Sequence, residues 1–185
     1  SVCIGMLFSK EITKIDQALK EGSTLNSIVG GSKISTKIKV LENLLEKSQK
    51  VLVGGGIANT FMKAMGYEIG KSLVEDNMLD RAKKMLKTDK IVMPENVYIA
   101  ESSEMGEVTL VPVEDVPKDK MILDIEFNFA EMNKFSSEMT IWNGPLGMFE
   151  QDKFSNGTKK LISYLEHTSS KVIAGGGETI FAIKK

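Results

Sequence analysis

The chain has 185 residues, of which 42% are hydrophobic, enough for one domain with a full core. Its 24 Lys and Arg residues are balanced by 25 Asp and Glu, so the net charge of −1 gives no field to attract nucleic acid or an anionic membrane. One cysteine, Cys3, excludes an internal disulfide, and no apolar stretch approaches the roughly 20 residues that span a bilayer. We therefore expect a cytoplasmic monomer without nucleic-acid or membrane partners.

The start of the chain is apolar but has no initiator methionine and no basic region typical of a signal peptide. We expect it to be part of a longer protein.

Apolar runs of strand length recur along the chain, and each stops at a glycine or at a turn containing proline. The runs are 27–29, 51–53, 91–93, 139–142 and 172–174. Because they are apolar on both faces, they indicate a parallel sheet covered on both sides. Between these runs, apolar residues recur at the spacing of one helix face, at positions 34, 38, 41 and 45 and again over 78–86. This alternation predicts an α/β fold: a doubly wound, mainly parallel, Rossmann-like sheet flanked by helices.

The segment 96–124 has a different pattern. Short apolar runs at 97–99, 108–111 and 121–123 are separated by polar turns instead of helices. This spacing predicts a small antiparallel excursion at one edge of the sheet.

Three consecutive glycines follow two of the predicted strands, Gly54–Gly56 and Gly175–Gly177. In a parallel sheet both lie at the carboxyl edge, where bare backbone N–H groups can approach a phosphate. A glycine run can equally serve only a tight turn. Neither run completes the dinucleotide fingerprint, because Asn59 and Ile180 stand where its last glycine is required, so an NAD-dependent dehydrogenase is disfavoured.

Lys33 and Lys37 follow another predicted strand end, Gly30-Gly31. Placed four residues apart on one face of a helix, they would repel unless an anion lies between them, and the positive end of the helix dipole adds to this. Two solvated surface lysines are the alternative.

Two carboxylates stand beside predicted strand ends. Glu178 follows the second glycine run, where it could hold a magnesium ion bound to phosphate. Alternatively, it is a glutamate in the first turn of a helix, favoured there by the helix dipole alone. Glu150 ends the loop after Trp142-Asn143-Gly144-Pro145, where it could accept both ribose hydroxyls while Met148 and Phe149 face a base. A plain strand end with a core Trp and Phe would have the same pattern.

The remaining reactive residues indicate no covalent catalysis. The single histidine, His167, lies in a polar segment typical of a surface helix end, and Cys3 is expected to be a buried small hydrophobe. There is no nucleophile elbow and no Cys/His cluster with metal-ligand spacing.

Taken together, these motifs resemble the C-terminal nucleotide-binding domain of the phosphoglycerate kinase family. The matching segments are 30–38, 54–56 with Thr60-Phe61, 68–73, 141–150 and 175–179, in the family's order. The resemblance implies that residues 1–185 form one nucleotide-binding domain of a two-domain kinase. Such enzymes transfer a phosphoryl group between 1,3-bisphosphoglycerate and ADP, with Mg²⁺, by direct in-line transfer on domain closure.

The resemblance also assigns roles to residues. Lys33, Lys37 and Gly176 would be catalytic, and Glu178 would hold the metal. The nucleotide would be bound by Gly31, Lys33, Lys37, Gly54, Gly55, Gly56, Leu73, Leu123, Asn143, Pro145, Met148, Glu150, Gly176, Gly177, Glu178 and Thr179.

Several positions depart from the family pattern. Ser32, Thr36 and Glu178 stand where the family usually has Ala, Asp and Asp, and Ile122-Leu123-Asp124 lacks the glycine that precedes the leucine. The family's N-terminal domain, which binds phosphoglycerate, and its last glycine-rich turn have no counterpart here. We therefore expect weak ADP or ATP binding and negligible turnover, with a non-catalytic nucleotide-binding module as the alternative.

Overall fold

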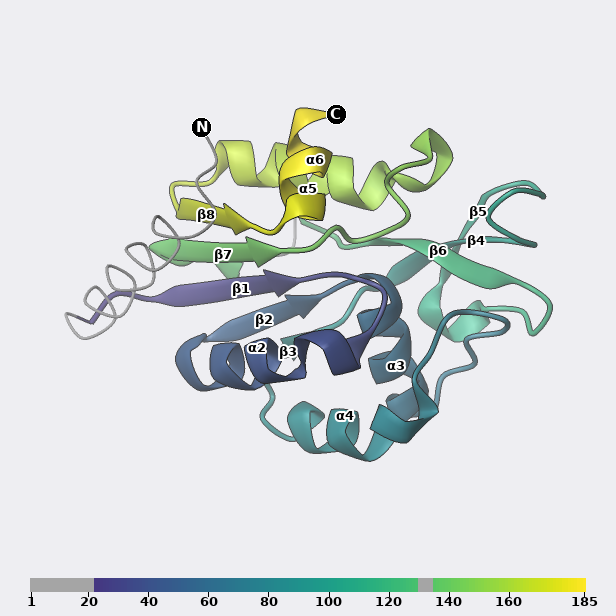
Figure 1. The fold of residues 1–185 in the computed structure, drawn as a ribbon, viewed down its shortest axis with the longest axis horizontal. Coiled ribbons are helices and arrows are strands. Elements are labelled where there is room, and N and C mark those ends of the chain that lie inside the picture. Colours follow the sequence, from purple (N-terminus) through teal and green to yellow (C-terminus); the bar gives the residue numbers. More distant parts are fainter. Residues whose placement is uncertain (1–21, 130–134) are drawn as a thin grey trace.

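The computed structural model describes residues 22–129 and 135–185, so Cys3 lies outside the described residues. Within them, five parallel strands form the main sheet in the order β3-β2-β1-β7-β8 (Figure 1). The strands are β1 (Leu25–Val29), β2 (Lys50–Val53), β3 (Ile91–Val92), β7 (Met139–Asn143) and β8 (Lys171–Gly175). Each of the predicted strands is confirmed.

The strand order places a topological switch between β1 and β7. From β1 the chain runs outward through β2 to β3, whereas from β7 it runs the opposite way to β8. Connections that leave neighbouring parallel strands in opposite directions open a crevice at the carboxyl edge of the sheet, which is where such folds bind ligands.

Helices occupy the connections between parallel strands, as the pattern predicts, and a further helix follows β8. They are α2 (Ile34–Lys47), α3 (Gly55–Met65), α4 (Leu79–Leu86), α5 (Asn156–His167) and α6 (Gly177–Lys184). In Figure 1, α2, α3 and α4 gather around the β1–β2–β3 half, and α5 and α6 lie beside β7 and β8. Apolar residues of α2 and α4 are buried in the core, including Leu41 and Met85, and α4 packs against α3. None of the described helices has the length and apolar character needed to cross a membrane.

The antiparallel segment is confirmed, but it forms a sheet of its own and is not hydrogen-bonded to an edge of the main one. Its order is β5-β4-β6, from β4 (Asn96–Ala100), β5 (Thr109–Pro112) and β6 (Met121–Glu126). This small sheet packs against the helices of the domain: Val97 and Ile125 are fully buried, and β6 contacts α3 and α5.

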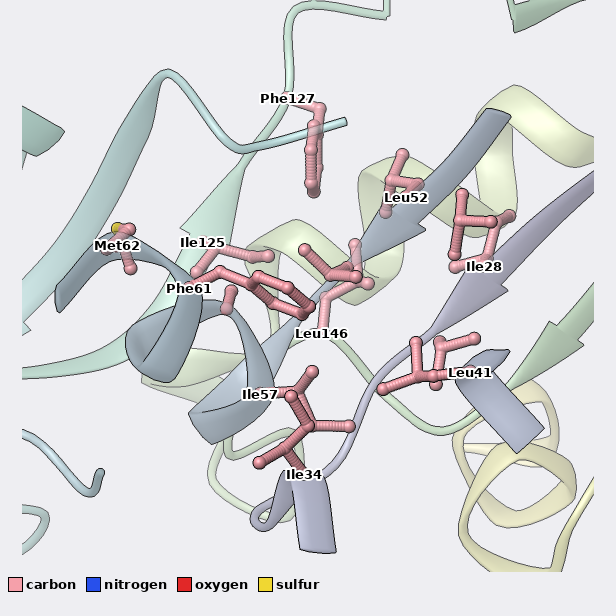
Figure 2. Packing of buried hydrophobic residues seen from close by; sticks show 14 of the residues in the cluster. Ile28, Ile34, Leu41, Leu52, Ile57, Phe61, Met62, Ile125, Phe127 and Leu146 are labelled. Carbon is pink, nitrogen blue, oxygen red and sulfur yellow. The ribbon is translucent and has the colours of Figure 1, made fainter. Parts of the chain in front are cut away.

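One core joins the two sheets. Figure 2 shows Phe61 of α3, Ile125 of β6 and Leu146, which follows β7, pointing toward one another. All three are fully buried in the same hydrophobic cluster. This shared core fixes β6 beside the carboxyl edge of the main sheet.

Candidate functional site

The loops that follow β1 and β7 touch at the topological switch. A Cβ on Gly30 would stand 1.9 Å from Pro145 O, and one on Gly144, whose φ is +100°, would stand 2.2 Å from Gly30 O. Only glycine allows this approach, because any side chain would overlap the neighbouring backbone. Glycine at these two positions therefore lets the loops after β1 and β7 come into direct backbone contact.

Lys37 ties the same two loops together. Its Nζ donates to Gly30 O at 2.7 Å and to Asn143 O at 3.2 Å. Burial lowers the pKa of Lys37, and the nearby charge of Glu178 opposes that shift. The side chain therefore places a cation at the switch, within electrostatic reach of the carboxylate that begins α6.

Lys33 does not share a helix face with Lys37, contrary to the sequence expectation. It is the extended residue that caps α2, with φ −132° and ψ 127°, and its side chain is exposed. The backbone stays extended through this residue, and Glu75 occupies the first turn of α2 by accepting from Ser35 N at 2.8 Å and Ser35 Oγ at 2.5 Å. Lys33 therefore precedes α2, whereas Lys37 lies within it.

The first glycine run packs against the loop after β1. A Cβ on Gly55, whose φ is +62°, would stand 2.7 Å from Gly31 O, and one on Gly56 would stand 2.1 Å from Ser32 O. Two of its N–H groups are already used, since Gly54 N donates to Val29 O and Gly55 N donates to Leu146 O. Its main role is therefore close packing and not phosphate capture.

The second glycine run is arranged differently. Gly176, with φ +98°, caps α6, and a Cβ on Gly177 would meet no atom within 4 Å. Thr179 Oγ1 donates to Gly175 O at 2.8 Å and accepts from Gly144 N at 2.7 Å. Asn143 Nδ2 donates to Gly175 O at 3.0 Å. These bonds hold the start of α6 against the end of β7 and leave open space beside Gly177, at the positive end of the α6 dipole.

A cavity of about 400 Å³ lies along this carboxyl edge. Nine predicted nucleotide-binding residues line it: Gly31, Gly55, Gly56, Leu73, Leu123, Pro145, Met148, Glu150 and Glu178. The other seven lie outside its walls: Lys33, Lys37, Gly54, Asn143, Gly176, Gly177 and Thr179. The structure therefore brings the expected base and ribose residues together, and sets most of the expected phosphate residues beside them.

Sequence reasoning assigned no binding role to seven residues that line the cavity: Ser32, Asn59, Ile122, Asp124, Ile125, Leu146 and Gly147. Asp124 is buried, and its Oδ1 accepts from Ile125 N at 2.9 Å while its Oδ2 accepts from Gly157 N at 2.8 Å. Burial raises the pKa of Asp124 to about 7, against the opposing effect of these N–H donors. A lone carboxylate in the apolar run 122–125 was the available signal for it.

A larger hollow of about 930 Å³ lies elsewhere, among residues that include Glu126, Phe129, Lys160, Tyr164 and His167. Two of its charged side chains are paired with each other, because Lys160 Nζ donates to Glu126 Oε1 at 2.5 Å. His167 is exposed at the end of α5 with Nδ1 2.7 Å from Ser163 O, so the predicted surface helix end is confirmed. This hollow has no glycine-rich strand end, and we do not assign it the ligand.

Among the described residues, no group of three or more His, Cys, Asp or Glu side chains is placed to hold a metal by itself. Glu178 is a single carboxylate at the cavity wall. One carboxylate suits Mg²⁺ when the remaining ligands are waters and phosphate oxygens.

Comparison with known proteins gives a consistent result. A model of the phosphoglycerate kinase family matches residues 1–185. The chain is 45% identical to the phosphoglycerate kinase of Francisella philomiragia and 44% identical to that of Francisella tularensis subsp. novicida, in each case over 99% of this chain and 49% of the relative. The chain thus spans about half the length of these curated relatives.

Solved structures agree. The phosphoglycerate kinase of Coxiella burnetii superposes with a TM-score of 0.86 at 39% identity, covering 96% of this chain and 48% of that one. The enzyme of Pyrococcus horikoshii OT3 superposes with a TM-score of 0.77 at 26% identity, covering 97% and 48%. With the family model matching from end to end, the chain belongs to the phosphoglycerate kinase family.

Proposed function

We propose that residues 1–185 are the nucleotide-binding domain of a glycolytic phosphoglycerate kinase and that the carboxyl-edge cavity takes ADP or ATP. The observation that carries the proposal is the cavity itself: nine of the residues that the family resemblance assigns to the nucleotide line one space. Its position at the topological switch of a parallel sheet is where such folds bind nucleotides. Membership in this family favours the kinase over an NAD-dependent dehydrogenase.

The two ends of the cavity suit different parts of a nucleotide. Gly56, Leu73 and Leu123 form an apolar wall for the base. Glu150 lies beside Met148 and could accept the ribose hydroxyls. The phosphates would then extend toward Gly177 and the Nζ of Lys37, where open space, a helix N-terminus and a cation lie together.

Glu178 is the residue that would hold Mg²⁺. It lies at the cavity wall, and its charge acts on Lys37, so a cation and an anion flank the proposed phosphate position. When bound, the metal would neutralise charge on the phosphate oxygens. Lys37 and Lys33 would orient the phosphates, and Gly176 would let α6 begin close to them.

The full reaction needs a second substrate site. Phosphoryl transfer depends on positioning both substrates and neutralising their charge, and the relatives are about twice as long as this chain. We propose that phosphoglycerate binds only through the part of the enzyme that these 185 residues do not contain. The chain alone should show negligible turnover in a coupled assay. Turnover of about 1–1,000 s⁻¹ would contradict this.

Calorimetric titration with Mg-ADP, Mg-ATP and NAD tests the proposal. We expect weak one-to-one binding of the two adenine nucleotides and no measurable binding of NAD. Tight binding of NAD alone would overturn the assignment. Binding of ADP that does not respond to Mg²⁺ would instead remove the metal role of Glu178, the position where this chain departs from the family pattern.

A further inference from the structure

The carboxyl group of Asp124 is buried between two glycines. Asp124 lies on β6 and is 1% exposed. A Cβ on Gly147 would stand 2.0 Å from Asp124 Oδ1, and one on Gly157 would stand 2.8 Å from the same oxygen. Because neither position leaves room for a side chain, the loop after β7 and the start of α5 both approach the carboxyl group with their backbone. Three parts of the chain therefore meet at one buried carboxyl group.

This carboxyl group caps α5 from outside the helix. Asp124 Oδ2 accepts from Gly157 N at 2.8 Å, at the positive end of the helix dipole. The residue just before the helix, Ser155, does not cap it, because its hydroxyl donates to Asp152 O at 2.7 Å. The first turn of α5 also has no acidic residue. The helix thus takes its side-chain cap from β6, 33 residues earlier in the chain.

The capped turn of α5 holds the loop that follows β7. Thr158 is buried beside the cap, and its Oγ1 accepts from Leu146 N at 3.1 Å. Two residues further along the loop, Met148 N donates to Leu123 O of β6 at 2.8 Å. The loop is therefore fixed to β6 once by a backbone bond and a second time through α5 and the carboxyl group of Asp124.

The same loop carries the ribose end of the cavity. Met148 and Glu150 both line the cavity, and Glu150 is exposed, so its side chain is not fixed by burial. An exposed carboxylate keeps its direction only when the backbone that carries it is fixed. The far end of the loop is held by Lys185, whose Nζ donates to Glu150 O at 2.9 Å. The near end depends on α5 and β6, and hence on Asp124.

We propose that Asp124 is a positioning residue for the nucleotide: its carboxyl group fixes the start of α5 and the loop 146–148, and so places Glu150 where it accepts the ribose hydroxyls. The inference rests on the proposed function, because it takes Glu150 as the ribose-binding residue. Asp124 acts through the backbone, because each of its oxygens already accepts from an N–H group.

The test is a double-mutant cycle between Asp124→Ala and Glu150→Ala, with the affinity for Mg-ADP measured by nuclear magnetic resonance titration of the 185-residue chain. Each single variant should bind Mg-ADP about fivefold more weakly than the unsubstituted chain. The double variant should be no more than about twofold weaker than Glu150→Ala alone, because Asp124 acts through Glu150.

Two results of the cycle would overturn the role of Asp124. One is that the two losses multiply, to about 25-fold in the double variant, as independent effects do. The other is that either single variant binds Mg-ADP as tightly as the unsubstituted chain. A cap that served stability alone would give the second result, because the folded variant would keep an intact site.

Leu161→Ala is the matched control for stability. It empties a fully buried position of α5 without touching the cap, so it should lower the melting temperature and leave the affinity of the folded chain for Mg-ADP within about twofold. A loss of affinity equal to that of Asp124→Ala would show that binding follows stability, and would overturn the positioning role.

Thr158→Val breaks the same connection at its next bond. It removes the oxygen that accepts from Leu146 N and keeps the carboxyl group of Asp124, so it should weaken Mg-ADP binding only while Glu150 is present. A thermal melt shows whether each variant is folded, and Thr158→Val replaces Asp124→Ala in the cycle if that variant is not. Unchanged affinity in a folded Thr158→Val would contradict the route through α5.

Failure of this inference differs from failure of the proposed function. If the unsubstituted chain binds Mg-ADP and the cycle shows independent effects, the role of Asp124 is overturned and the nucleotide site stands. If the unsubstituted chain does not bind Mg-ADP, the proposed function is overturned and the inference with it.

Discussion

Lys37 serves the fold and the candidate site with one side chain. Its bonds to Gly30 O and Asn143 O join the loops after β1 and β7, the two strands that flank the switch. Both acceptors are backbone carbonyls at the edge where phosphate would bind. Removing the ammonium therefore takes away a link between strands as well as a positive charge.

We expect Lys37→Met to lower the free energy of unfolding by about 1–2 kcal/mol, because two carbonyls lose a charged donor that is partly screened by solvent. Urea denaturation measures this. Lys33→Met is the matched control, because Lys33 is exposed and outside the helix, and should change stability by less than about 0.5 kcal/mol. Both variants should weaken Mg-ADP binding. Equal stabilities for the two variants would contradict the linking role of Lys37.

Asp124 gives a pH dependence with a defined sign. Burial raises the folded-state pKa to about 7, above the value near 3.9 of an unfolded chain, so the folded state holds the proton between those values. Folding then binds a proton, and this contribution to stability is lost as pH rises through the folded pKa.

We expect the unsubstituted chain to lose about 1–3 kcal/mol of stability relative to Asp124→Asn as pH rises from about 5 to 8. The asparagine carries no titrating proton, so other groups cancel in the difference between the two chains. Chemical denaturation at several pH values provides the measurement. Two stability curves that run parallel would show that Asp124 does not titrate in this range.

At the scale of elements, α5 meets β6 at a glycine. A Cβ on Gly157 would stand 1.9 Å from Ile125 O and 2.8 Å from Asp124 Oδ1. The start of α5 is thus in backbone contact with the strand whose Leu123 and Ile125 line the cavity. The position of that wall depends on how closely the helix can approach.

Two competing effects decide the outcome of Gly157→Ala. Alanine favours the helix by about 0.5–1 kcal/mol, whereas the overlap with β6 costs about 1–3 kcal/mol, so we expect net destabilisation. Thermal denaturation measures it. Gly177→Ala is the control, because its Cβ meets no atom within 4 Å at the start of α6, and its stability should stay the same or rise slightly. A stabilised Gly157→Ala would refute the close contact.

The elements follow from local patterns in the sequence, and the site follows only in part. Strands that end in glycine and helices with apolar spacing are properties of short segments, which is why 25–29 and 34–47 agree with their predicted counterparts. Lys33 precedes α2, and Ser35 at the helix start bonds to Glu75, which lies 40 residues further along the chain. No local pattern carries that information. Asn59 was noticed only as a break in a fingerprint, because its bond to Leu73 O exists only once α3 packs beside Leu73.

At the scale of the whole molecule, function depends on strand order. The two glycine runs follow β2 and β8, which β1 and β7 separate in the sheet. Similar in sequence, they differ in structure: the first packs against the loop after β1, and the second begins α6 beside open space. A nucleotide lying across the edge would place its base at the first run and its phosphates at the second.

The most direct test of that placement is chemical-shift mapping of the isotope-labelled 20.4 kDa chain during titration with Mg-ADP. We predict saturable shifts at Gly56, Leu123 and Gly177, along the carboxyl edge of the sheet, with little change at Tyr164 and His167 around the larger hollow. Shifts confined to the larger hollow, or no shifts at millimolar Mg-ADP, would contradict the account.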